Sequence, residues 1–145
     1  MEIEFYNKNV IDNNKLLYAI IVSKYNGRWI FVRHKERDTW EIPAGHREEN
    51  EEIEITAKRE LFEETGAKEF KIKYINDYSL KINEEKSYAA LFYAEISILG
   101  ELPDFEIGEV KEFNDIPEKL TYPNIQPYLF NKVKEEINKF DFKKI

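Results

Sequence analysis

The sequence predicts a mixed α/β fold, with strands around a central helix and a second helix near the C-terminus. Segments rich in β-branched and aromatic residues lie on both sides of residues 52–65, whose apolar residues recur at helical spacing. A second stretch with helical spacing follows the last of these segments. Strands and helices do not alternate regularly, which argues against a doubly wound parallel sheet.

The composition is that of a globular protein, and we expect a single domain over residues 1–145. Hydrophobic residues make up 42% of the chain and aromatic residues 14%, enough for a core. Cysteine is absent, which excludes disulfides and thiolate sites. We find no basic and apolar leader and no apolar run long enough to cross a bilayer, so we expect a cytoplasmic protein without a membrane partner. The net charge of −7 argues against a stable nucleic-acid partner.

The N-terminal part of the chain favours three strands. Residues 3–6 suit a short first strand, and residues 16–25 are rich in β-forming residues. Residues 28–33 form the third segment, and Asn26-Gly27 separates it from the second. This dipeptide best accepts the positive φ angles of a two-residue turn, so we expect a hairpin here.

A polar loop, residues 34–39, connects this hairpin to the segment before the central helix. Pro43 forbids helix there and holds Ile42 in an extended conformation. Gly45 then gives the backbone freedom to turn closely around a ligand.

Residues 52–65 are expected to form the central helix, which ends at Gly66. Its apolar residues fall into two stripes, one of Ile53, Ala57 and Leu61 and the other of Ile55 and Phe62. Acidic residues lie between the stripes. We therefore expect a helix wedged between two packed layers, with its acidic strip facing a cleft.

The C-terminal half favours three further strands and the second helix. Residues 70–80 and 87–99 suit two long strands joined by a turn at 83–85, and residues 107–113 suit another strand. The last helix is expected to follow residues 121–124 and to run to about Phe140. Its apolar spine has four-residue spacing and consists of Ile125, Leu129, Val133 and Ile137.

Three carboxylates of the central helix predict a metal site. Glu60, Glu63 and Glu64 project from neighbouring turns, and like charges at this spacing cost each pair a few tenths of a kcal/mol. Such oxygen ligands suit Mg²⁺, or Mn²⁺, which share substrate phosphates. The alternative is a solvated acidic face. The two apolar stripes, and Arg59 as a bidentate partner for Glu51 or a neighbouring carboxylate, favour the metal site.

The spacing of these residues resembles that of a known family. Gly45, five residues, Glu51, seven residues and then residues 59–67 match the Nudix box, G-x5-E-x7-R-E-U-x-E-E-x-G-U, where U is aliphatic. Every fixed position is present, and Ala67 is a small version of the final U. Together with Trp40-Glu41-Ile42-Pro43 and the strand order, the resemblance covers most of the chain. It implies a Nudix-type α/β/α sandwich, with a mixed sheet between the box helix and the C-terminal helix.

The resemblance also implies roles for individual residues. Glu60, Glu63, Arg59 and Glu51 would form the catalytic set, with Glu60 as a ligand or the base and with Arg59 and Glu51 orienting the carboxylates. The metal ligands would be Glu60, Glu63, Glu64 and the backbone carbonyl of Ala44, where the family often has glycine. Another carboxylate from a later loop often completes such a site, and Glu84, Glu85, Glu106 and Glu109 are all open candidates.

Substrate contacts are expected from residues outside the acidic helix. Arg33 belongs to a basic island before the box and is a candidate for polyphosphate, the alternative being a solvated strand end. Phe31 is a candidate for stacking on a base, and Asn124 for reading a purine edge. For these two the alternatives are core packing and a helix cap. Glu41 of the Trp-Glu-Ile-Pro segment completes the expected substrate set.

The resemblance implies Mg²⁺-dependent hydrolysis of a diphosphate linkage in a nucleotide. We expect a nucleoside triphosphate, including oxidised ones such as 8-oxo-dGTP, to give a nucleoside monophosphate and pyrophosphate. The alternatives are pyrophosphate removal from the 5′ end of RNA and a non-enzymatic nucleotide-binding module. Hydrolysis of ADP-ribose is less favoured, because that branch usually has extra N-terminal strands. The protein is expected to be a monomer or a homodimer.

Overall fold

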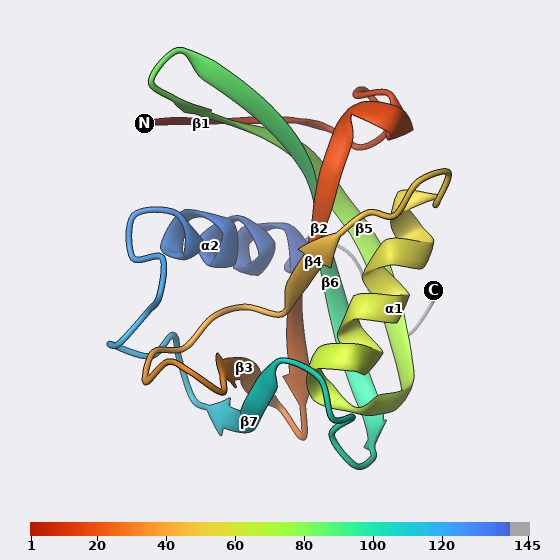
Figure 1. Ribbon diagram of the computed structural model, residues 1–145, viewed down its shortest axis with the longest axis vertical. Coiled ribbons are helices and arrows are strands. Elements are labelled where there is room, and N and C mark those ends of the chain that lie inside the picture. The colour runs from red at the N-terminus through yellow and green to blue at the C-terminus, as the bar shows by residue number, and fades with distance from the viewer. Residues whose placement is uncertain (140–145) are drawn as a thin grey trace.

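A mixed β-sheet with one long helix on each face makes up the protein (Figure 1), whose computed structural model describes residues 1–139. No helix among these residues is long and apolar enough to cross a membrane. The elements are β1 (Glu2–Asn7), η1 (Asn13–Lys15), β2 (Leu16–Tyr25), β3 (Arg28–His34), β4 (Ala44–His46), α1 (Ile53–Thr65), β5 (Ala67–Ile82), β6 (Glu85–Leu99), β7 (Ile107–Phe113) and α2 (Gln126–Ile137).

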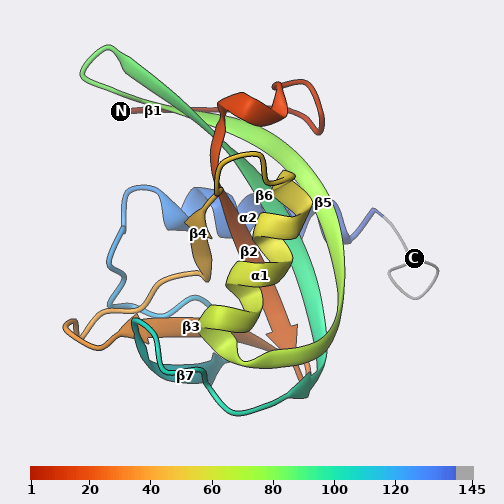
Figure 2. The ribbon, with the colours of Figure 1, turned by 45° about the vertical axis from the view of Figure 1, so that its right-hand side comes forward.

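The sheet is mixed, as predicted. Its strand order is β1-β5-β6-β2-β3-β7, and β4 pairs with β2 outside this path. Strands β2 and β6 are parallel, whereas the other named pairs are antiparallel. The long strands β5 and β6 curve behind α1 in Figure 2, and their turn extends beyond both helices beside β1.

Both faces of the sheet are buried, because α1 and α2 cover opposite sides. Successive side chains of a strand point to opposite faces, and β2 follows this rule: Ala19 and Ile21 pack in the core under α1, whereas Ile20 and Val22 pack in the core under α2. Such two-sided burial explains why β2 is a nearly continuous apolar run. The α/β/α sandwich expected from the sequence is confirmed.

Two hairpin turns have positive φ angles, and only one of them could be predicted from the sequence. Asn26 and Gly27 have φ angles of 54° and 76°, which confirms the predicted hairpin. Between β5 and β6 the turn is Asn83-Glu84, also with positive φ angles, and Glu85 already pairs with Ile82. The expected turn at 83–85 is therefore one residue too long. A glutamate with positive φ is uncommon, so the sequence does not indicate it.

Several element boundaries differ from expectation for tertiary reasons. Strand β4 was not expected and forms by pairing with residues 18–20 of β2. Strand β5 begins at Ala67, directly after α1, rather than at residue 70. Helix α2 runs to Ile137 within the described part, and its expected end near Phe140 lies outside the described residues.

The expected second apolar stripe of α1 is wrong. Ile55 and Phe62 are 52% and 43% exposed, whereas the stripe of Ile53, Ala57 and Leu61 is buried. The reason is that α1 is an outer layer and packs against the sheet by one face only. The acidic strip therefore lies at the margin of this contact, beside β4, rather than between two apolar layers.

Gly66 connects α1 to β5 in a confined space. Its φ angle is 79°, and its N–H donates to the carbonyl of Phe62 at 2.8 Å. A Cβ atom here would lie 2.5 Å from the carbonyl oxygen of Glu101. Gly66 thus meets two constraints, a left-handed backbone and a close neighbouring chain.

We expect Gly66→Ala to destabilise the protein by about 3 kcal/mol and Gly27→Ala by about 1 kcal/mol, as measured by urea unfolding. Both glycines have positive φ, but a Cβ at Gly27 would meet nothing within 4 Å. The difference therefore isolates the steric contact with Glu101. Equal losses in the two variants would contradict this explanation.

Candidate active site

Arg59 holds the loop before α1 against the helix. Its Nε and Nη2 donate to the two carboxylate oxygens of Glu51 at 2.8 and 2.9 Å, a bidentate ion pair. The hydroxyl of Thr56 donates to the same carboxylate at 2.7 Å. Arg59 is the main reason that the pKa of Glu51 falls to about 2. Glu51 is therefore a charged anchor for the guanidinium.

The remaining donors of Arg59 reach the acidic strip. Nη1 donates to Glu60 at 2.8 Å and to Glu63 at 3.0 Å, and Nη2 donates to the carbonyl of His46 in β4 at 3.0 Å. Glu51, and then Glu60, raise the pKa of Arg59 further against the effect of burial, so it stays charged. One guanidinium thus brings together the whole catalytic set predicted from the sequence.

Glu60 lies against the backbone of β4. A Cβ atom on Gly45 would come within 1.9 Å of the Glu60 carboxyl carbon, so only glycine leaves room for this side chain. Burial raises the pKa of Glu60 to about 7, with Glu63 adding to the rise and Arg59 opposing it.

Glu64 is buried more deeply than the other carboxylates of the strip. Its Oε1 accepts a hydrogen bond from the N–H of Ala44 at 3.0 Å, which joins α1 to the start of β4. Burial raises its pKa to about 8, against the effect of the Ala44 bond, and Glu60, Glu41 and Glu106 add to the rise. The negative charge of the strip is therefore only partly balanced by Arg59.

A carboxylate hollow of about 260 Å³ lies over this strip. Of the four later carboxylates considered, only Glu106 lines it. Glu109 pairs with Arg33 instead, and Glu84 and Glu85 lie at the β5–β6 turn. The lining residues of the carboxylate hollow are Glu60, Glu63, Glu64, Phe105, Glu106 and Ile107.

The donor set of the carboxylate hollow fits a hard divalent cation. Its polar side chains are all carboxylates, the oxygen ligands that Mg²⁺ and Mn²⁺ prefer, and burial raises the pKa of two of them, Glu60 and Glu64. Within residues 1–139, no three acidic or histidine side chains converge closely enough to hold an ion as they stand. The cause is visible in the contacts, because Arg59 draws Glu60 and Glu63 and Ala44 holds Glu64.

A large cavity of about 640 Å³ adjoins the carboxylate hollow, and Glu60, Glu64 and Glu106 line both. Its wall combines aromatic and aliphatic groups from β2, β5 and the start of α2 with polar groups from β3, β4 and α1. The remaining lining residues are Tyr18, Ile20, His34, Glu41, Ile42, Ala44, Gly45, His46, Arg47, Glu48, Arg59, Tyr78, Tyr122, Ile125, Gln126 and Leu129.

Gln126 is a polar residue of the large cavity that the sequence interpretation missed. It is 5% exposed, and its Oε1 accepts a hydrogen bond from the N–H of Ile42 at 2.9 Å. This bond fixes the amide orientation and leaves the NH₂ group as a donor. A signal was available, because Gln126 is a polar residue at helical spacing with Leu129 and Phe130 on the buried face of α2.

The expected substrate residues lie in different places. Glu41 does line the large cavity, where its carboxylate contacts His34 at 3.1 Å and Arg37 at 2.8 Å. Arg33 does not line it, and its guanidinium donates to Glu109 at 3.4 Å and to the carbonyl of Arg37 at 2.9 Å.

Phe31 and Asn124 need correction. Phe31 is 1% exposed and packs against Phe113 and Phe130, so its ring offers no face to a base; the packing alternative holds. Asn124 is exposed and does not line the large cavity. The N-cap of α2 is Ile125, without a side-chain cap, so the capping alternative also fails.

The chain is similar to known proteins over most of its length. The NUDIX domain model matches residues 15–130. The chain is 29% identical over 122 residues to YtkD of Bacillus subtilis (strain 168), which is named as a candidate 8-oxo-dGTP diphosphatase, and the match covers 83% of this chain and 75% of YtkD.

Two solved structures illustrate the likeness in fold. The Bacillus subtilis pyrophosphohydrolase BsRppH gives a TM-score of 0.76 at 24% identity, over 92% of this chain and 90% of that one. The NUDIX domain of Shewanella oneidensis NrtR, solved with ADP ribose, gives 0.66 at 17% identity, over 91% and 94%.

The raised pKa values predict that the metal-free protein loses stability as the pH rises from about 4.5 to 8. A folded-state pKa of about 7 for Glu60 and about 8 for Glu64, against 4.5 ordinarily, means that unfolding releases protons in this range. Glu64→Gln should flatten this slope in urea unfolding at pH 5, 6, 7 and 8. Glu54→Gln, at an exposed position in the first turn of α1, should not. Identical slopes in wild type and Glu64→Gln would refute the assignment.

Proposed function

Because the chain belongs to the NUDIX domain family and is an enzyme acting on diphosphate bonds, we propose that it hydrolyses a nucleoside triphosphate with Mg²⁺, or Mn²⁺, as cofactor. Hydrolysis adds water across one P–O–P linkage and gives a nucleoside monophosphate and pyrophosphate. The observation that carries this proposal is the shared border of the two hollows, where Glu60, Glu64 and Glu106 line both. A nucleoside in the large cavity would place its phosphates over these carboxylates.

The carboxylates divide the work in this proposal. Glu60, Glu63, Glu64 and Glu106, with the carbonyl of Ala44, would hold the cation, which supplies the positive charge that polarises a phosphoryl oxygen and activates water. If Glu60 is instead the base that activates water, its pKa of about 7 in the metal-free protein lies close to neutral pH. Arg59, anchored by Glu51, orients Glu60 and Glu63.

The large cavity supports a purine as the base. Tyr18, Tyr122 and Ile125, which are not buried, supply apolar surface, and the NH₂ group of Gln126 is a donor for a carbonyl oxygen on the base edge. An oxidised purine such as 8-oxo-dGTP carries two such carbonyls. The name of YtkD, at 29% identity, supports the same substrate class.

Two alternative functions are distinguished by the experiment below. Removal of pyrophosphate from the 5′ end of RNA needs the same chemistry, and the net charge of −7 disfavours it. A non-enzymatic binding module would not require the complete set of carboxylates that Arg59 gathers.

We further propose one domain over residues 1–145, acting on a small-molecule nucleotide as a monomer or homodimer in the cytoplasm.

The proposed reaction predicts pyrophosphate release from at least one member of a panel of ordinary and oxidised nucleoside triphosphates, with triphosphate-ended RNA as a further arm. Chelation of the metal should abolish it. Glu63→Gln should lose about 100-fold or more in kcat, because a charged ligand of the proposed cation is removed. Glu54→Gln is the matched control and should retain activity. Full activity of Glu63→Gln, or no hydrolysis of any panel member by the wild type, would reject the proposal.

The proposed base contact predicts a selective loss in Gln126→Glu. A glutamate keeps an oxygen for the N–H of Ile42 but removes the donor. We expect kcat/KM for 8-oxo-dGTP to fall about 10- to 100-fold, the usual range for losing a base-edge contact. Hydrolysis of a pyrimidine nucleoside triphosphate should change much less. Equal losses for both substrates would show that Gln126 does not read the base.

A further inference from the structure

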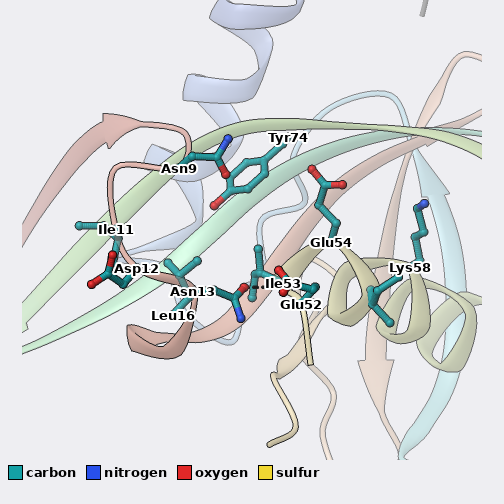
Figure 3. A pocket seen from close by; sticks show the side chains of 11 residues that line it. Asn9, Ile11, Asp12, Asn13, Leu16, Glu52, Ile53, Glu54, Lys58 and Tyr74 are labelled. Atoms are coloured by element: carbon teal, nitrogen blue, oxygen red, sulfur yellow. Dashed lines mark hydrogen bonds between the residues drawn. The ribbon is translucent and has the colours of Figure 1, made fainter. Parts of the chain in front are cut away.

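A third hollow, of about 590 Å³, lies on a part of α1 outside the active site and shares no lining residue with the other two. Figure 3 shows it between the loop that precedes β2, the first turn of α1 and Tyr74 of β5. Asn13 of the loop points at Ile53, where the helix begins, and the dashed line marks their hydrogen bond. This contact joins two segments that are 40 residues apart.

Asn13 caps α1 from a distant part of the chain. The N-cap residue Glu52 makes no side-chain cap bond. Instead, Oδ1 of Asn13 accepts a hydrogen bond from the N–H of Ile53 at 2.9 Å, which satisfies a free donor of the first turn. Its Nδ2 donates to the carbonyl oxygen of Glu51 at 3.0 Å. The two partners fix the amide orientation, because one is a donor and the other an acceptor.

The second bond connects Asn13 to the catalytic set. Glu51 is held at its carbonyl by Asn13 and at its carboxylate by Arg59, which in turn holds Glu60 and Glu63. Arg47 reinforces the same junction: its Nη1 donates to the carbonyl of Glu51 at 3.4 Å, and its Nη2 donates to the carbonyl of Asn14 at 3.1 Å. A shift of Glu51 would therefore move the guanidinium of Arg59, and with it the carboxylate of Glu60.

The loop that carries Asn13 is itself fixed to the sheet. Asp77 of β5 is fully buried, and its Oδ2 accepts a hydrogen bond from the N–H of Ile11 at 3.0 Å. Its other oxygen accepts the hydroxyl hydrogen bond of Tyr74. The loop that carries Asn13 is therefore held by a hydrogen bond to β5, independently of α1.

We propose that Asn13 is a positioning residue for the active site, acting through Glu51 and Arg59 on Glu60 and Glu63. Its two atoms have separate effects: Oδ1 stabilises the start of α1, and Nδ2 holds Glu51 in the position that Arg59 requires. This inference rests on the proposed hydrolysis for its kinetic test, and a second measurement is independent of activity.

The kinetic test uses Asn13→Ala and Asn13→Asp. Alanine removes both bonds, so Tm should fall by about 3 °C and kcat by about 10-fold, with KM within about twofold. Aspartate keeps an acceptor for Ile53 and adds favourable charge at the helix start, but it turns an oxygen towards the Glu51 carbonyl. We therefore expect Asn13→Asp to retain Tm and still lose about 10-fold in kcat.

Two control variants separate positioning from stability. The side chain of Asn14 is exposed, so Asn14→Ala should change neither Tm nor kcat. Val133 lies buried under α2 and lines none of the three hollows, so Val133→Ala should lower Tm and leave kcat unchanged. A wild-type kcat in Asn13→Asp, or a loss of kcat in Val133→Ala equal to that in Asn13→Ala, would overturn the proposal.

The independent measurement is the ¹H–¹⁵N signal of the Arg59 Nε–H group, which donates to Glu51. Its exchange with water should be slow in wild type and Asn14→Ala, and at least about tenfold faster in Asn13→Ala and Asn13→Asp. If the wild type hydrolyses no nucleotide, the proposed function fails while this signal still decides the role of Asn13. If the wild type is active and the signal is the same in all variants, only the positioning role fails.

Discussion

The active site depends on one positive charge among many negative ones. Glu51, Glu60 and Glu63 all accept hydrogen bonds from Arg59, whereas Glu64 accepts one from a backbone N–H and Glu106 lies 4.0 Å from His34. Carboxylates this close repel one another, and burial strengthens the repulsion. The surrounding backbone meets this constraint by packing: Gly45 makes room for Glu60, and the Ala44 N–H holds Glu64. Repulsion among these carboxylates therefore destabilises the fold locally, at the site proposed for the cation.

Features set by local spacing could be predicted from the sequence. The hairpin at Asn26-Gly27 and the buried α2 residues Leu129 and Val133 follow from turn preference and helical periodicity, and the gathering of carboxylates around Arg59 follows from the resemblance to the Nudix box. The presence of Glu106, rather than Glu109, in the lining of the carboxylate hollow could not be predicted in this way. The pairing of β3 with β7 shifts register between Arg33 and His34, so alternation along the strand fails there. No periodic pattern in a single sequence reveals such an irregularity.

Other misses have one cause, which is that burial depends on what covers an element. Phe31 alternates with its neighbours as expected, but α2 covers that face of the sheet, so the ring lies in the core. Ile55 and Phe62 follow helical spacing, but nothing covers their side of α1. Sequence periodicity assigns residues to a face; it does not say whether a second layer lies against that face.

The two-sided sheet also separates the parts of the site. The carboxylates come mainly from α1 on one face, whereas Gln126 and Leu129 come from α2 on the other and Ile125 is the N-cap of α2, and the two helices share no core cluster. Substitutions in the first turn of α2 can therefore reshape that end of the large cavity without moving the charged cluster. In evolutionary terms, the same carboxylate cluster can be paired with many versions of the α2 end, and under the proposed function a laboratory redesign of selectivity would start at that turn.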